Sequence, residues 1–374
     1  MNKILVINAG SATLKYKVFT ADNFKLEREG IVERIGLKDS FLKNEKKEVH
    51  WPKGLLDHDQ ALVEIIKTLV DILPEIRLVG HRIVHGGEKF NKPTLLNVKV
   101  VKELEKYNKL APLHNPVSLA CIKKSLKLLP QAKQYGVFDT AYFTTIPEYA
   151  YRYALPESLQ RQYGIRRYGF HGLSHQSAAA EAAAKLGKPL NKLKIITCHL
   201  GSGCSMTATL NGKAVATTLG FTPMEGLMMS TRCGDLDSGI ILFLLDQGFS
   251  SAKISEILNK KSGLLGVAGT MDMREILFAA GEKVIGYKSS KKKIPSAKAK
   301  LALKMFVYNI VRYVGQFRAI MQGVDLIVFT GGIGERSPAV RNLVVKELRG
   351  LDNFKTAVIK ANEELTIAKE LSRK

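Results

Sequence analysis

The sequence has few cysteines and no long apolar run, and each shortage narrows what the protein can be. Its four cysteines show none of the paired spacings that hold a metal ion, which favours a reduced, cytoplasmic protein. No apolar stretch is long enough to span a bilayer. The amino terminus enters a strand-like run without a basic-then-apolar signal segment. We therefore expect a cytoplasmic protein with no membrane partner.

Acidic residues are also scarce, because 57 lysines and arginines face 34 aspartates and glutamates, a formal charge of +23. Such a charge is compatible with nucleic-acid binding. However, the lysines are spread along expected helices and loops, with one local cluster at 291–293. Aromatic and basic residues do not alternate as base stacking requires. A basic solvated surface is therefore expected, and a nucleic-acid site, which salt-sensitive gel shifts would reveal, is the less favoured alternative.

The chain of 374 residues is too long for one ordinary core, so we expect two domains. Short apolar runs alternate with segments of helical spacing, which is typical of an α/β fold. Residues 22–54 read as irregular, and 284–298 read as an exposed loop. The expected strands cover 3–8, 16–19, 76–79, 135–138, 193–198 and 326–330, and the expected helices cover 60–73, 99–109, 119–129, 177–185, 239–247 and 298–321.

Three glycine-rich segments each follow an apolar strand. They are Asn8–Ser11 in VINAGSATLK, residues 199–203 in HLGSG, and residues 329–335 in FTGGIGE. A tight glycine turn after a strand exposes backbone N–H groups that can hold an anion. The strand-and-hairpin opening of the chain recurs in altered form at 195–216. The pattern predicts a nucleotide-phosphate site built from two similar halves.

These segments belong to a longer ordered set of motifs that resembles the acetate kinase family over nearly the whole chain. The resemblance implies a fold similar to actin, sugar kinases and heat-shock ATPase domains, with two ribonuclease H-like α/β domains, a central cleft and a duplicated βββαβαβα-type core. It implies one domain at 1–140 with 360–374, and a second at 141–359 that holds the nucleotide site and the dimer interface. The motifs are VINAGSATLK, GHRIVHGGEKF, APLHNPVSL, VFDTAYFTTIPEYAY, RRYGFHGLSH, CHLGSGCSMTATLNGK, GFTPMEGLMMSTRCGD, KSGLLG, DMR, FTGGIGE and NEEL.

The resemblance implies reversible phosphoryl transfer between ATP and acetate, giving acetyl phosphate and ADP, in a homodimer with Mg²⁺ or Mn²⁺. Acetate is already ionised at neutral pH, so the reaction needs no strong general base. It needs two anions held in line with their repulsion cancelled. A propionate or butyrate kinase stays open as an alternative, and so does a non-catalytic actin-like nucleotide-binding protein.

Five residues match the catalytic positions of the family. Arg82 and Arg232 would place planar guanidinium groups on carboxylate and phosphate oxygens. Asp139 would act on magnesium through water and orient the acceptor. His171 and His199 would donate hydrogen bonds to the transferring phosphoryl group. A lone histidine or arginine is more often structural, and it is the motif context that favours function here.

The remaining matched positions fall into ligand-binding groups. Metal-binding positions are Asn8 and Glu363. Positions of the acetyl pocket, beside Arg82, are Val84, Leu113, Phe170 and Pro223. The first phosphate turn contributes Ser11 and Thr13. Nucleotide-binding positions are Lys15, His199, Gly201, Ser202, Gly203, Asp272, Met273, Arg274, Gly331, Gly332, Ile333 and Gly334, and Ser205 is expected to belong to the second phosphate turn.

Three positions depart from the family pattern. Ala12 replaces a serine, Ser202 an asparagine, and Arg336 a further asparagine. Ser202 is a shorter donor in the second phosphate turn, and Arg336 adds charge beside the expected nucleotide. The resemblance therefore leaves the preferred phosphoryl donor open.

Overall fold

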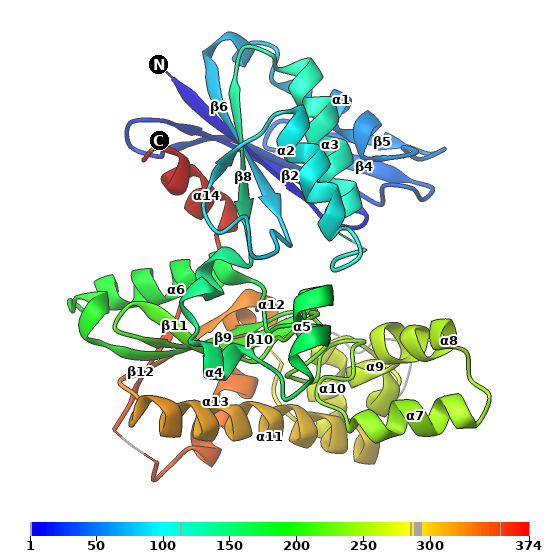
Figure 1. Ribbon diagram of the computed structural model, residues 1–374, viewed down its shortest axis with the longest axis vertical. Coiled ribbons are helices and arrows are strands. Elements are labelled where there is room, and N and C mark those ends of the chain that lie inside the picture. The colour runs from blue at the N-terminus through cyan, green and yellow to red at the C-terminus, as the bar shows by residue number, and fades with distance from the viewer. Residues whose placement is uncertain (1, 113, 285, 288–293, 352, 374) are drawn as a thin grey trace. The chain divides into compact units, whose positions relative to one another are not determined.

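The computed structural model describes residues 2–112, 114–284, 286–287, 294–351 and 353–373 (Figure 1). The chain divides into two compact units, Met1–Thr144 with Asn362–Lys374, and Thr145–Ala361. Within the described ranges, no helix combines the length and the apolar character that crossing a bilayer would need.

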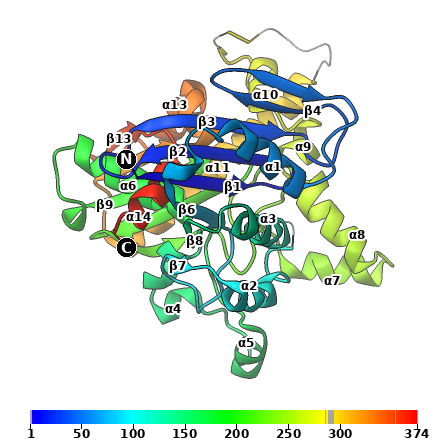
Figure 2. The same ribbon diagram turned by 90° about the horizontal axis from the view of Figure 1, so that it is seen from above.

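The first unit is built on an eight-stranded sheet with the order β5-β4-β3-β2-β1-β6-β8-β7. Strands β1 to β5 pair with their sequence neighbours in antiparallel fashion, whereas β6 runs parallel to β1 and β8 runs parallel to β6. Figure 2 shows β1, β2 and β3 side by side. The strands are β1 (Lys3–Ala9), β2 (Thr13–Thr20), β3 (Leu26–Glu33), β4 (Ser40–Asn44), β5 (Glu48–Trp51), β6 (Ile76–Ile83), β7 (Thr94–Leu95) and β8 (Lys133–Phe138).

The expectation of an irregular segment at 22–54 is wrong, because β3, β4 and β5 lie within it. Strand β3 is mostly half-exposed and rich in charge, so its sequence lacks the clear apolar alternation that marks a strand. It forms because β2 offers an antiparallel partner along its whole length, from Thr13 opposite Glu33 to Phe19 opposite Leu26. Tertiary pairing overrides weak local propensity here.

Alternation along β1 directs its side chains to opposite faces of the sheet. Leu5 and Ile7 belong to the core that includes helix α1. The other face, which carries Asn8, is covered by the carboxyl-terminal helix, since a Cβ at Gly80 would meet Ile367. The helices of the unit are α1 (His58–Thr68), α2 (Val98–Leu104), α3 (Asn115–Leu128) and α14 (Glu363–Leu371), with 3₁₀ turns at Leu73–Glu75, Glu105–Tyr107 and Ala141–Thr145.

The second unit is built on a five-stranded sheet with the order β11-β10-β9-β12-β13. An antiparallel meander of three strands is followed by two strands parallel to the first, as in β3-β2-β1-β6-β8 of the other unit. The α/β class and the duplicated core are therefore confirmed. The strands are β9 (Lys194–Leu200), β10 (Cys204–Leu210), β11 (Lys213–Thr217), β12 (Leu326–Thr330) and β13 (Lys355–Val358).

Helix α6 packs an alanine-rich face on the second sheet, with Ala178, Ala179 and Ala182 in the core beside Ile195 and Val328. Small side chains allow this close approach of helix and sheet. The helices of the unit are α4 (Glu148–Tyr151), α5 (Glu157–Tyr163), α6 (Gly172–Lys185), α7 (Ser238–Asp246), α8 (Ser251–Glu256), α9 (Gly263–Ala268), α10 (Met273–Ala280), α11 (Ser296–Met321), α12 (Gly331–Arg336) and α13 (Pro338–Glu347), with a 3₁₀ turn at Leu190–Lys192 and a π turn at Ile257–Lys261.

The third glycine segment is a helix start rather than a glycine turn. Strand β12 leads directly into α12, whose first residue, Gly331, has a φ of 77°. A Cβ at Gly331 would lie 2.8 Å from the Leu200 carbonyl oxygen, so the glycine allows the start of the helix to approach the end of β9. Part of the expected loop at 284–298 lies outside the described residues.

Candidate active site

Three predicted residues of the first unit lie where neighbouring parallel strands end. Asn8 is near the end of β1, Arg82 is near the end of β6, and Asp139 follows β8. The backbone N–H of Asp139 donates to the Ile83 carbonyl, 3.0 Å away, which fixes the first residue after the strand. The carboxyl ends of parallel strands are a common place for ligand sites in α/β folds.

Arg82 is the centre of this group. Its Nη2 lies 2.7 Å from Asp139 Oδ2 and its Nε lies 3.1 Å from Oδ1, so the pair has two parallel hydrogen bonds. Arg82 Nη1 lies 2.9 Å from Glu363 Oε2 and donates to Asn8 Oδ1 at 3.3 Å. Burial lowers the pKa of Arg82, but the charges of Asp139 and Glu363 outweigh it, so the net pKa shift is upward. Arg82 therefore stays cationic.

Glu364 is a member of this group that the sequence analysis did not single out. It is 7% exposed, and its Oε1 accepts a 2.8 Å hydrogen bond from Asn8 Nδ2. Its Oε2 lies 3.6 Å from Lys17 Nζ. Asn8 Nδ2 also donates to Glu363 at 3.3 Å. The only sequence signal was its place beside Glu363 in the NEEL motif.

The same residues form a set of hard oxygen donors that could hold a divalent cation. Asp139, Glu363 and Glu364 contribute three carboxylates, with Arg82 beside the first two and Lys17 beside Glu364. Among the described residues no ready-made metal cage of three or more ligands is present. Mg²⁺ commonly uses one or two carboxylates together with water and phosphate oxygens, so the donor set fits this ion when a phosphate ligand is also present.

The first phosphate turn joins β1 to β2 beside this group. The Gly10 N–H donates to the Thr13 carbonyl at 2.8 Å, and His58 Nε2 lies 2.8 Å from the Gly10 carbonyl oxygen. Ser11 is exposed. Lys15 is paired directly with Asn8 across the two strands, so the ammonium and the amide belong to the same face of the sheet.

In the second unit, both predicted histidines come together. The rings of His171 and His199 stack with centroids 4.5 Å apart. His199 lies in β9, whereas His171 caps α6 with a φ of 58°, a left-handed conformation that a non-glycine residue adopts only under constraint. A Cβ built on Gly203 would lie 3.5 Å from His171 Nε2 and 3.6 Å from Arg232 Nη1. The glycine therefore leaves space between these two nitrogens.

Arg232 is a largely buried cation without a carboxylate partner among the described residues. Its Nη1 donates to the Pro223 carbonyl at 3.0 Å and contacts Met229 Sδ at 3.6 Å. Burial lowers its pKa, and no carboxylate contributes to the shift. A desolvated guanidinium in this state is stabilised by an anion that brings its own charge.

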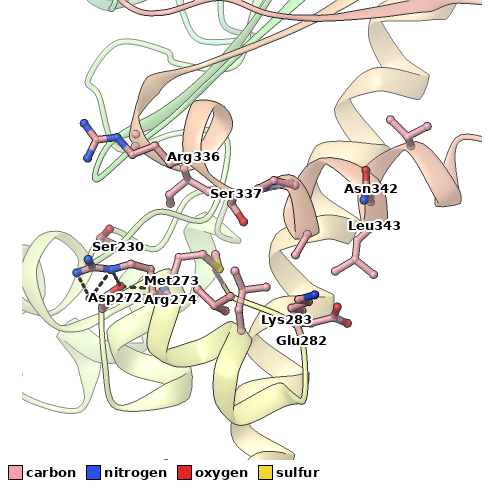
Figure 3. Close-up of a pocket in the computed structure, with 18 of the residues that line it drawn as sticks. Ser230, Asp272, Met273, Arg274, Glu282, Lys283, Arg336, Ser337, Asn342 and Leu343 are labelled. Atoms are coloured by element: carbon pink, nitrogen blue, oxygen red, sulfur yellow. Dashed lines mark hydrogen bonds and ion pairs between the residues drawn. The ribbon is translucent and has the colours of Figure 1, made fainter. Parts of the chain in front are cut away.

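A cavity of about 1210 Å³ opens in the second unit beside the turn at Gly201 and Ser202 (Figure 3). Gly201, the start of α12, α10 and α13 line it. Apolar side chains such as Met273, Leu277 and Leu343 are combined with a few polar groups, a composition that suits a nucleoside. The lining residues among the predicted nucleotide positions are Gly201, Ser202, Asp272, Met273, Arg274, Gly332 and Ile333.

The cavity also has lining residues that the sequence analysis missed. Asn342, Leu343 and Lys346 lie on α13, whose sequence reads as an ordinary amphipathic helix and carries no motif. Of the predicted nucleotide positions outside the lining, Gly331 and Gly334 are buried in α12. Asp272 caps α10 and is held by an ion pair with Arg274 at 2.6 Å (Figure 3).

The predicted acetyl-pocket residues are divided between the units. Val84 is 9% exposed in the first unit, Phe170 is 1% exposed in the second, and Pro223 touches Arg232 through its carbonyl. Leu113 lies outside the described residues. Their shared role as a pocket for the acetyl methyl group stays a prediction.

Comparisons with known proteins agree over the full chain. A model described as the acetokinase family matches residues 3–372. The acetate kinase of Carboxydothermus hydrogenoformans is 43% identical over 403 residues, which cover 98% of each chain. That of Halothermothrix orenii is 42% identical over 405 residues, which cover 99% of each chain.

Solved structures give the same assignment and confirm the two-domain actin-like α/β fold. Porphyromonas gingivalis acetate kinase superposes with a TM-score of 0.87 at 39% identity, covering 99% of this chain and 98% of that one. A propionate kinase from Francisella tularensis superposes with a TM-score of 0.89 at 33% identity, covering 99% of both chains. The chain is therefore a member of the acetokinase family.

Proposed function

We propose that this protein is a cytoplasmic acetate kinase that transfers a phosphoryl group reversibly between ATP and acetate, giving acetyl phosphate and ADP. The observation that carries the proposal is Arg232, a desolvated cation beside His171 with no carboxylate partner among the described residues. Such a group fits a reaction whose reactants are both anions. Family membership narrows those anions to a short carboxylate and a nucleotide.

The proposed chemistry is direct in-line attack of an acetate oxygen on the γ-phosphorus of ATP, with ADP as the leaving group. Because acetate is ionised, the work of the protein is positioning and charge stabilisation. Arg232 and Arg82 would hold carboxylate and phosphoryl oxygens. His171 and His199 would donate to the phosphoryl group, and the Gly201–Gly203 turn would leave space for its oxygens.

Bound Mg²⁺ would supply positive charge on the phosphate oxygens. We assign its protein contacts to the oxygen-rich group of the first unit, with Asn8 and Glu363 as the nearest candidates and Asp139 acting through water. Glu364 fixes the amide of Asn8 through its 2.8 Å hydrogen bond. Arg82 forms ion pairs with both Asp139 and Glu363 and so keeps these two carboxylates close to each other.

A hydroxylamine trap for acyl phosphate tests the proposal directly. With Mg²⁺ and ATP, we expect acetate to be the best acceptor, propionate to be poorer by roughly 10-fold, and butyrate to be poorer still, because one methylene in an apolar pocket changes the free energy by about 1–3 kcal/mol. Repeating the series with GTP and pyrophosphate identifies the donor, and chelation of the metal should abolish product.

Other outcomes of this assay would identify a different function. A propionate or butyrate optimum would favour the second candidate, which the similarity to a solved propionate kinase supports. ATP binding without any acyl phosphate would instead favour a non-catalytic nucleotide-binding protein.

We further propose that the protein is a homodimer and that α7 lies at the interface. None of the residues of this helix is buried, although its sequence is SGIILFLLD. Leu242 is 64% exposed, Phe243 is 60% exposed, and Ile240 and Leu245 are 41% and 43% exposed. Contiguous apolar surface of this kind is typical of a protein–protein contact. Self-association of identical chains is the simplest way to cover it.

Replacing Phe243 with glutamate should therefore break the dimer. Burying the new charge would raise the dissociation constant by at least roughly 30-fold, as expected for a large interface side chain. Light scattering coupled to gel filtration measures the mass. Val98→Glu is the matched control, since Val98 is 81% exposed in the first unit, and its mass should not change. A dimeric Phe243→Glu protein would place the interface elsewhere.

A further inference from the structure

A chain of hydrogen bonds extends from His171 into the core of the second unit. His171 Nδ1 lies 2.9 Å from Ser205 Oγ, and Ser205 Oγ lies 2.7 Å from His175 Nε2. His175 Nδ1 lies 2.6 Å from Thr197 Oγ1, which donates to the Thr207 carbonyl at 3.5 Å. His175, Ser205 and Thr197 are completely buried. Ser205 thus contacts two histidines.

The Thr207 carbonyl, at the end of this series of hydrogen bonds, determines which atom donates in each of them. The Thr207 carbonyl can only accept, so the single hydroxyl proton of Thr197 is used there and Thr197 accepts from His175 Nδ1–H. Neutral His175 then has a lone pair on Nε2, which accepts from Ser205. Ser205 has no second proton, so it accepts from His171 Nδ1–H. The nitrogen of His171 beside Gly203 and Arg232, Nε2, is then the one that lacks a proton in the neutral ring.

We infer that His175, Ser205 and Thr197 are positioning residues that hold His171 in its Nδ1–H form, so that His171 donates to the transferring phosphoryl group only as an imidazolium. The inference rests on the proposed phosphoryl transfer and adds the protonation state in which His171 works. A neutral ring would turn a lone pair toward the phosphoryl oxygens and repel them.

The groups around His171 are consistent with this assignment. His175, on the same helix, stays neutral because burial, and then the charge of His199, lower its pKa well below the ordinary value. Cys204 on β10 is also neutral, since burial raises its pKa to about 12. His199 on β9 stacks on the ring, and Arg232 faces it across the Gly203 space. An anion bound in this space would offset the charge of Arg232 and favour the imidazolium form of His171.

Replacing Thr197 tests the direction of these hydrogen bonds and leaves the proposed ligand-binding residues unchanged. Valine has the same shape as threonine but no hydroxyl to accept a hydrogen bond, so in Thr197→Val the proton of neutral His175 should be on Nε2 instead of Nδ1. His175 then donates to Ser205, and Ser205 donates to His171 Nδ1, which reverses both hydrogen bonds. Thr197→Ser retains the hydroxyl and is the matched control. Histidine-selective ¹⁵N NMR at pH 8.5 distinguishes the two neutral forms of His171, whose signal is assigned by its loss in His171→Asn. We expect Nδ1–H in wild type and in Thr197→Ser, and Nε2–H in Thr197→Val.

The pH profile of kcat supplies a second readout. If His171 donates as an imidazolium, wild-type kcat should fall as pH rises from 6 to 8.5. The ratio of kcat at pH 6 to kcat at pH 8.5 should be smaller by roughly 10-fold in Thr197→Val, because the neutral His171 ring of that variant can donate. Thr197→Ser should match wild type.

An Nε2–H form of His171 in wild type would overturn the inference, and so would an unchanged pH profile in a folded Thr197→Val protein. If Thr197→Val does not fold, the wild-type spectrum decides alone. Absence of acyl phosphate in wild type would refute the proposed function and leave the NMR result standing.

Discussion

The Arg232→Ala variant is expected to lose roughly 10²–10³-fold in kcat/KM for acetate and ATP, the loss expected when a preorganised donor to a transferring group is removed. Among the residues that the structure describes, no carboxylate pairs with Arg232, and burial lowers its pKa. Its charge is therefore available to the reactants. For the same reason, removal of the charge should not lower the melting temperature, because no buried carboxylate among the described residues loses its ion pair.

Arg232→Lys separates charge from geometry. A lysine keeps the positive charge but cannot place two parallel N–H groups on one anion, so we expect it to recover only part of the lost activity. Steady-state kinetics and a thermal melt of the same preparations are the measurements. Near-normal turnover in Arg232→Ala would remove Arg232 from the active site, and a large fall in melting temperature would give it a structural role.

The Arg82→Ala variant should lose activity to a similar extent, but its stability should fall as well. Arg82 makes ion pairs with Asp139 and Glu363, and Asp139 is 1% exposed. Removing one partner of a buried pair costs about 3–5 kcal/mol, because the other charge stays desolvated. A thermal or urea melt should therefore show a clear fall in the free energy of unfolding, unlike the melt of Arg232→Ala.

The pH dependence of that loss identifies its cause. Burial raises the pKa of Asp139 in the wild type, against the charge of Arg82. Without Arg82 the pKa should rise further. A folded state that binds a proton more readily than the unfolded state gains stability as pH falls through the raised pKa. The stability gap between Arg82→Ala and wild type should thus narrow from pH 8 to pH 5, and a constant gap would contradict the assigned ion pairs. Arg82→Lys, which retains a charge, should show a smaller gap.

A feature can be predicted from the sequence when the residues that produce it are close together in the chain. Strand β1 and its glycine turn could be predicted because a short continuous apolar run and glycine are local signals. That Asn8, Arg82 and Asp139 lie together follows from parallel strands that end at one edge of a sheet. His171 and Arg232 belong to the other unit. That they line one cavity together with these three residues therefore stays a prediction.

Other features gave no local signal. Strand β3 is charged and half-exposed, and it became a strand because β2 was available as a partner. Ser205 forms hydrogen bonds with His171 and His175, which lie 34 and 30 positions away in the sequence. Nothing near Ser205 in the chain indicates that two imidazoles would approach it.

The sequence by itself determined which chemical groups the protein has and where the strongly apolar strands β1, β9 and β12 lie, because residue type and short-range pattern are properties of neighbouring positions. Only the tertiary structure decided which charges are compensated. Arg82 met Asp139, 57 positions away, and Glu363, whereas Arg232 met a carbonyl oxygen. Burial makes that difference matter, since a charge removed from water depends on the few groups that surround it.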